Sequence, residues 1–118
     1  MELMEAVRKR RSCRAFTDQQ ITPAELEQLL QAACAAPVGL GRYEDVHLSV
    51  IQSAALLAKI EANTHRAIPT MEHPFYGAPT VIAINCREEA DLSLATANAS
   101  AIAENLLLAA TDLGLGSV

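Results

Sequence analysis

A compact group of basic residues near the N-terminus is the part of this sequence best suited to chemistry. Five of the nine Lys and Arg residues lie within the first fourteen positions, and Ser12 lies among them. The five are Arg8, Lys9, Arg10, Arg11 and Arg14. Guanidinium groups offer planar, paired donors that suit phosphate or carboxylate, and a serine hydroxyl adds a short donor. These residue types therefore predict a small site for a multiply charged anion.

The charge of the remaining chain restricts what this basic group could bind. Residues 1–14 carry a net charge of +3, whereas residues 15–118 carry −8. Basic runs are often only solvated surface, and basic N-terminal arms often bind nucleic acid. However, the acidic remainder would repel a polyanion, and an aromatic content of 3% leaves little to stack on bases. We therefore expect no nucleic-acid partner, and solvated surface stays the alternative to a small-anion site.

Other signatures of chemistry are missing from the sequence. The three histidines have no close helical spacing, and no Cys-x-x-Cys pair occurs, so we expect no metal ion. A Ser–His–acid triad lacks the Gly-x-Ser-x-Gly elbow that would support it. Neither common glycine-rich phosphate loop is present. The basic group is therefore the strongest candidate for an anion site.

The composition predicts one domain without a membrane span. The chain has 118 residues, of which 51% are hydrophobic, so it can bury a moderate core. No apolar run reaches the roughly 18–20 residues needed to cross a bilayer, and no apolar segment follows the basic N-terminus as in a secretory signal. Three cysteines are an odd number, which argues against a disulfide framework. We therefore expect a cytoplasmic protein that has no membrane partner.

Hydrophobic periodicity and turn residues predict the elements that must position the basic group. They predict helix 2–11, helix 23–36, strand 46–51, helix 53–63, strand 80–86 and helix 91–113. The Thr22-Pro23-Ala24-Glu25 run combines an N-cap, a proline at the first helical position and a glutamate at the third. Pro37 ends this helix, and the glycines of the Val38-Gly39-Leu40-Gly41 loop permit close backbone approach. Residues 64–79 contain three prolines and predict an extended loop.

The second strand and the last helix predict the buried centre of the fold. The run 80–86 is almost continuously apolar, which predicts burial on both faces. Helix 91–113 is apolar around most of its circumference, as in a helix at the centre of a fold or an interface. Its exception is a polar stripe at seven-residue spacing: Asp91, Asn98, Asn105 and Asp112. Gly114 reads as a C-cap, and the residues after it read as the start of another strand.

The order of motifs along the chain resembles that of the nitroreductase-like family of FMN-dependent oxidoreductases. The resemblance covers essentially the whole chain, and its first and last motifs together make it fairly specific. The motifs are Arg10-Arg11-Ser12-Cys13-Arg14-Ala15-Phe16, Ile21-Thr22, Ala35-Ala36-Pro37, Tyr76-Gly77-Ala78-Pro79-Thr80 and the run 109–117. We therefore expect residues 1–118 to form a single FMN-binding domain of this family that lacks its C-terminal portion.

The resemblance implies both an architecture and a chemistry. It implies an α+β fold with a central, mostly antiparallel sheet flanked by helices, in an intertwined homodimer with FMN at the subunit interface. It implies that two electrons pass from NAD(P)H through the flavin to a nitroaromatic, quinone or similar acceptor by a ping-pong mechanism. A flavin carries such chemistry itself, which agrees with the lack of an acid–base dyad, so we expect no catalytic side chain.

The resemblance also implies roles for seven residues. Arg10 and Ser12 would hold the FMN phosphate or ribityl chain, and Arg11 would contribute nearby. Arg14 would face the pyrimidine edge of the flavin ring and stabilise negative charge there. The ring would also be lined, from the other subunit, by Pro37, Val38 and Gly39.

The second motif departs from the family pattern. Many relatives have Ala-Pro-Ser followed by an Asn, whereas this chain has Ala36-Pro37-Val38-Gly39-Leu40-Gly41. Side-chain hydrogen bonds to the flavin would therefore be absent at this motif or replaced by backbone groups. The alternative hypothesis is a non-enzymatic module that binds FMN or another phosphorylated ligand.

Overall fold

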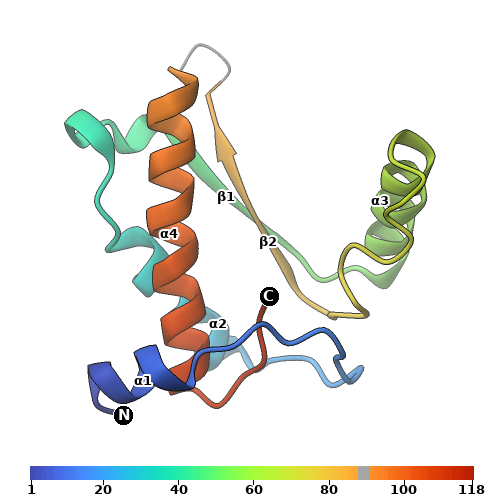
Figure 1. Cartoon of the computed structure of the whole chain (residues 1–118), viewed down its shortest axis with the longest axis horizontal. Coiled ribbons are helices and arrows are strands. Elements are labelled where there is room, and N and C mark those ends of the chain that lie inside the picture. The colour runs from blue at the N-terminus through green and yellow to red at the C-terminus, as the bar shows by residue number, and fades with distance from the viewer. Residues whose placement is uncertain (88–90) are drawn as a thin grey trace.

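The chain folds around one long helix and one strand pair (Figure 1). The computed structural model describes residues 1–87 and 91–118. Its elements are α1 (Leu3–Lys9), α2 (Pro23–Cys34), β1 (Val46–Ile51), α3 (Ala54–Ala67), β2 (Val81–Cys86) and α4 (Leu92–Asp112), with short 3-10 turns at Gly39–Gly41 and Tyr43–Asp45. Helices together with an antiparallel strand pair make this an α+β fold, as predicted.

The two strands form an antiparallel ribbon in a register that runs from Val46 opposite Cys86 to Ile51 opposite Val81. The guanidinium of Arg87 pairs with Asp45 at 3.1 Å and fastens the open end of this ribbon. Helix α4 packs against both β2 and α2, and α1 contacts α4. Helix α3 stands apart from α4, at the other end of the ribbon (Figure 1).

Local signals account for the start of α2. The Thr22 hydroxyl accepts the Glu25 N–H at 3.2 Å, and the Glu25 carboxylate accepts the Thr22 N–H at 2.7 Å. This is the capping box that the sequence predicts, with Pro23 at the first helical position. The helix ends at Cys34, three residues before Pro37, the residue predicted to end it.

Helix α4 begins and ends close to its predicted bounds. The Asp91 carboxylate accepts the Leu94 N–H at 3.0 Å at the N-terminus. Gly114 takes a φ of +73° after the last turn, a conformation that glycine adopts without strain. Among the described residues, no helix is both long and apolar enough to cross a membrane.

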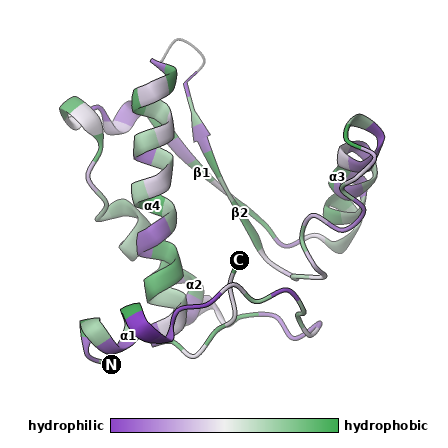
Figure 2. Cartoon of the chain, in the orientation of Figure 1, coloured by the Kyte–Doolittle hydropathy of each residue, from purple (hydrophilic) through white to green (hydrophobic). Residues whose placement is uncertain are grey.

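Small residues build the core where α2 meets α4. Ala33, Ala36, Val38 and Ile102 form its buried centre, and apolar residues of the ribbon pack against them. Ala33 lies on α2 and Ala36 follows it, so small side chains let this segment approach α4 closely. Figure 2 shows α4 as mostly hydrophobic, whereas the end of α1 and the segment after it are strongly hydrophilic.

Some expectations are wrong in detail. Helix α1 ends at Lys9 rather than at residue 11, so Arg10 and Arg11 lie outside it. Helix α3 extends to Ala67 rather than Asn63, because no breaker occurs before Pro69 and the basic His65 and Arg66 suit the last turn of a helix. Strand β2 is partly exposed along its length rather than buried on both faces. The reason is that α4 packs against it while α3 lies away from it (Figure 1).

Candidate functional site

The basic string, residues 10–14, leaves α1 as an extended segment. It is held by the residues that follow α4. Arg10 is the C-cap of α1, with φ −55° and ψ 127°. Ser12 forms a parallel bridge with Ser117, and the Cys13 N–H donates to the Ser117 carbonyl at 2.8 Å. The string is therefore held in place by backbone hydrogen bonding from the segment after α4, rather than left as a loose arm.

Close packing at Gly116 fixes which way the side chains of the string point. A Cβ at Gly116 would lie 3.0 Å from the Cys13 sulfur, so a side chain at this position would press against Cys13. Neighbouring side chains of an extended segment point to opposite sides. Ser12 and Arg14, on either side of Cys13, are both exposed. The string therefore turns its sulfur inward and offers Ser12 and Arg14 to a ligand.

The arginines of the string have no acidic partners in the described part of the chain. Lys9 is neutralised, because its ammonium group donates to Glu5 at 2.6 Å. This hydrogen bond, with the lysine charge, lowers the pKa of the Glu5 carboxyl. Within residues 1–87 and 91–118, no ion pair or side-chain hydrogen bond engages Arg10, Arg11 or Arg14. Three guanidinium groups are thus available to an anion.

The second group of predicted residues forms a tight turn against the N-terminal half of α4. Val38 is buried in the core, whereas Pro37 is exposed. The Gly39 N–H donates to the side-chain oxygen of Asn98 at 2.9 Å. A Cβ on Gly39 would lie 2.2 Å from a methyl carbon of Leu94, so the glycine does permit a close backbone approach. The element that it approaches is α4.

One chain does not bring the two predicted groups together. The Pro37–Gly39 turn contacts the N-terminal half of α4 at Asn98, whereas Ser12 is bridged to Ser117 in the segment that follows the helix. Figure 1 shows α1 at the foot of α4 and the segment before β1 beside its upper half.

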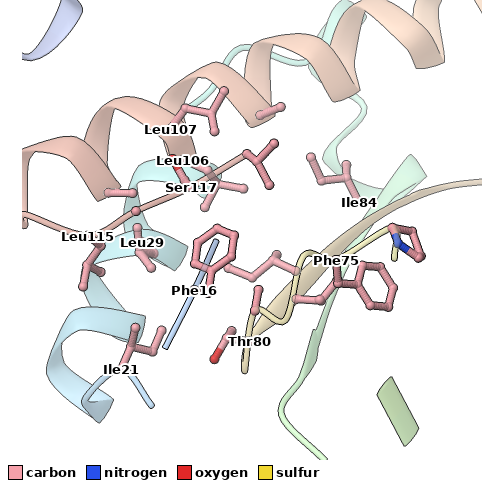
Figure 3. Close-up of a pocket in the computed structure, with 18 residues that line it drawn as sticks. Phe16, Ile21, Leu29, Phe75, Thr80, Ile84, Leu106, Leu107, Leu115 and Ser117 are labelled. Carbon is pink, nitrogen blue, oxygen red and sulfur yellow. The ribbon is translucent and has the colours of Figure 1, made fainter. Parts of the chain in front are cut away.

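An apolar pocket lies elsewhere in the chain (Figure 3). It has a volume of about 280 Å³ and lies between α4, β2, Phe16 and the residues that follow α4. Its lining includes the hydroxyls of Thr80 and Ser117 but no ionisable side chain, and none of the seven predicted residues. This pocket is therefore unsuited to an anion. In the described part of the chain, no group of three or more His, Cys, Asp or Glu is placed to hold a metal ion.

Sequence reasoning noticed the polar stripe of α4 but missed what its members do. Each one caps the helix or holds another segment. Asp91 caps α4, Asn98 holds the turn, and Asn105 donates to the Ala32 carbonyl at 2.9 Å. Asp112 lies 2.9 Å from the α-amino group of Met1 and raises the pKa of that amine by its hydrogen bond and charge. The sequence signal for these roles was the seven-residue spacing of the stripe, which is nearly two helical turns and places its members on one face.

Comparison with known proteins identifies the family. The sequence model of the Nitroreductase family matches residues 7–118, and the chain belongs to this family. The resemblance stated from its motifs is thereby confirmed. An Archaeoglobus fulgidus protein, provisionally named an NADH dehydrogenase/NAD(P)H nitroreductase, is 33% identical over 119 residues, which cover 99% of this chain and 66% of that protein.

Solved structures share the fold. An FMN-dependent nitroreductase from Clostridium difficile R20291 has a TM-score of 0.83 at 32% identity, over 98% of this chain and 58% of that one. A Bacteroides fragilis nitroreductase, solved with bound FMN, has a TM-score of 0.80 at 27% identity, over 97% of this chain and 66% of that one. The present chain thus spans between 58% and 66% of the length of these three relatives.

Proposed function

We propose that this protein is an FMN-dependent oxidoreductase and that residues 1–118 act as one FMN-binding domain. The observation that carries the proposal is the basic string, in which Arg10, Arg11 and Arg14 have no acidic partner within residues 1–87 and 91–118. It occurs in a family in which the Bacteroides fragilis relative is described with bound FMN. When bound, FMN would accept a hydride from NAD(P)H and pass two electrons to a nitroaromatic, quinone or similar acceptor in a ping-pong reaction. A cytoplasmic location stays a prediction from the sequence.

The residues of the string fit the parts of FMN. Phosphate suits paired guanidinium donors and a hydroxyl, and Arg10 with Ser12 supplies both within three residues. Arg11 adds positive charge nearby. Arg14 would offer its charge to the edge of the ring, where it favours uptake of an electron pair. The exposed Pro37 and the side-chain-free Gly39 would supply the apolar, close-fitting surface that a planar ring needs.

We propose that a second copy of the chain completes the site. The turn contacts the N-terminal half of α4 at Asn98, whereas the string is bridged to Ser117 in the segment after α4. A partner copy would bring its own turn to the string, as the resemblance to the family implies. Helix α1 also exposes apolar side chains beside the string: Leu3 at 68%, Met4 at 54% and Val7 at 44%. Burial of this surface against a partner would stabilise a homodimer.

Titration of the protein with FMN tests the proposal. Quenching of flavin fluorescence reports binding, and sedimentation measures the dimer. The double variant Arg10→Ala/Arg14→Ala should bind FMN at least about a hundredfold more weakly, since hydrogen bonds to charged groups contribute about 1.5–3 kcal/mol each. Arg8→Ala is the matched control, because Arg8 lies on α1 before the string. A wild-type protein that takes up no FMN would refute the proposal.

The alternative is a module that binds FMN without turning it over. Anaerobic addition of NADH or NADPH to the FMN-loaded protein distinguishes the oxidoreductase from the binding module. Bleaching of the flavin absorbance by one of the nucleotides, followed by recovery on addition of a quinone, supports the oxidoreductase. Bound flavin that neither nucleotide reduces would favour the binding module.

A further inference from the structure

We infer that Asn98 is a positioning residue for the flavin site, because it fixes the backbone of the Pro37–Gly39 turn from beneath. This inference rests on the proposed function, in which the turn lines the flavin ring. Asn98 lies on α4 and is not placed to contact a ligand itself. It would act through the peptide groups of the turn.

The contact is buried and specific. Asn98 is 7% exposed, the one polar residue among those buried in the described part of the chain. Its side-chain oxygen accepts the Gly39 N–H at 2.9 Å, across 59 residues of sequence. A buried amide that loses such a partner keeps the full cost of its desolvation. The turn is therefore held at one position along α4, and the Gly39 N–H is already engaged and cannot donate to a ligand.

The turn depends on this anchor because it offers no polar side chain of its own. Its residues are Pro37, Val38, Gly39 and Leu40, so a ligand must be recognised by backbone groups and apolar contact. Leu40 also has a φ of +58°, a conformation that is uncommon for a residue with a branched side chain, and it is 80% exposed. The hydrogen bond that the Gly39 N–H donates to Asn98 fixes the direction in which the neighbouring peptide groups face.

The same helix offers a matched control. Asn105 lies two turns further along the same polar stripe and donates to the Ala32 carbonyl at 2.9 Å. It therefore makes one hydrogen bond to a backbone atom of another segment, as Asn98 does. Its partner belongs to α2 rather than to the turn, so its loss should destabilise the fold without changing the flavin site.

The test compares Asn98→Leu with Asn105→Leu in the FMN titration, together with amide hydrogen exchange of the FMN-free protein. Asn98→Leu should weaken FMN binding roughly tenfold, equivalent to about 1.4 kcal/mol, and Asn105→Leu less than about twofold. Only Asn98→Leu should accelerate exchange of the Gly39 amide. Asn98→Asp keeps an acceptor oxygen, so it should restore slow exchange. Urea unfolding of each variant separates these effects from loss of stability.

Several results would overturn the inference. They are wild-type FMN affinity in Asn98→Leu, equal losses of affinity in the two leucine variants, or rapid exchange of the Gly39 amide in the wild-type protein. The last measurement needs no substitution and so decides the matter even if Asn98→Leu does not fold. A wild-type protein that binds no FMN overturns the proposed function and the ligand assigned to the turn. In that case, the exchange rate of the Gly39 amide still tests whether Asn98 holds the turn.

Discussion

Replacement of Gly39 by alanine should destabilise the protein, and the same replacement should become stabilising once Leu94 is shortened to alanine. The new Cβ would lie 2.2 Å from one methyl carbon of Leu94, 3.0 Å from its Cγ and 3.2 Å from its other methyl carbon. The whole end of the leucine must therefore move. Backbone strain does not contribute, because Gly39 has no positive φ.

The magnitude follows from two opposing effects. Overpacking of a core costs about 1–3 kcal/mol, and a cost of about 1.5–2 kcal/mol applies because Leu94 is half-buried and can partly give way. Against this, Gly→Ala in a permitted conformation stabilises by about 0.4–1 kcal/mol through the unfolded chain. We expect Gly39→Ala to lower the free energy of unfolding by about 1 kcal/mol in the wild-type background. In the Leu94→Ala background the clash is gone, so a gain of about 0.4–1 kcal/mol should remain.

Urea unfolding of the wild-type protein, both single variants and the double variant measures this change of sign. The coupling energy between the two positions should be about 1.5–2 kcal/mol, within the range found for residues in contact. Equal effects of Gly39→Ala in the two backgrounds would refute the reasoning, because they would mean that the turn does not pack on Leu94.

Three further predictions concern the elements that hold the site. Thr22→Ala should lower the free energy of unfolding by about 1 kcal/mol through loss of the capping box, and an unchanged urea midpoint would contradict it. Ile102→Ala, at a core position that is 3% exposed, should cost about 2–5 kcal/mol in the same assay, and a loss below about 1 kcal/mol would show that this part of the core is loosely packed. The raised pKa of the Met1 amine means that its pairing with Asp112 stabilises the fold below the amine's ordinary pKa and is lost as the pH rises through the raised one. Asp112→Asn should therefore reduce the loss of thermal stability at alkaline pH, and an identical pH profile would count against the pairing.

Elements that depend on neighbouring residues could be predicted from the sequence. The capping box of α2 lies within four residues, and both the strand 46–51 and the long helix were found at or within a residue of their observed bounds. The basic string was also visible, because charge is a property of composition. The resemblance of the chain to the family, which the family match confirms, rests on motifs that each span only a few residues.

What could not be predicted depends on pairs that are distant in sequence. The stripe on α4 was visible, but the partner of Asn98 lies 59 residues away and that of Asn105 lies 73 away. The periodicity of a helix shows which residues share a face, not which segment packs on that face. The burial of β2 was overestimated for the same reason, because an apolar strand does not reveal how much of it its own chain will cover.

The bridge between Ser12 and Ser117 has a consequence for how the protein is made. The basic string leaves the ribosome before the residues that pin it, which are more than a hundred positions later. At about 5–20 residues per second, synthesis takes several seconds to cover that distance. The string must stay unanchored during this time, because contacts between such distant residues form only after the intervening chain has been made and brought together. The basic string is therefore pinned only after the capping box and the ribbon can already have formed.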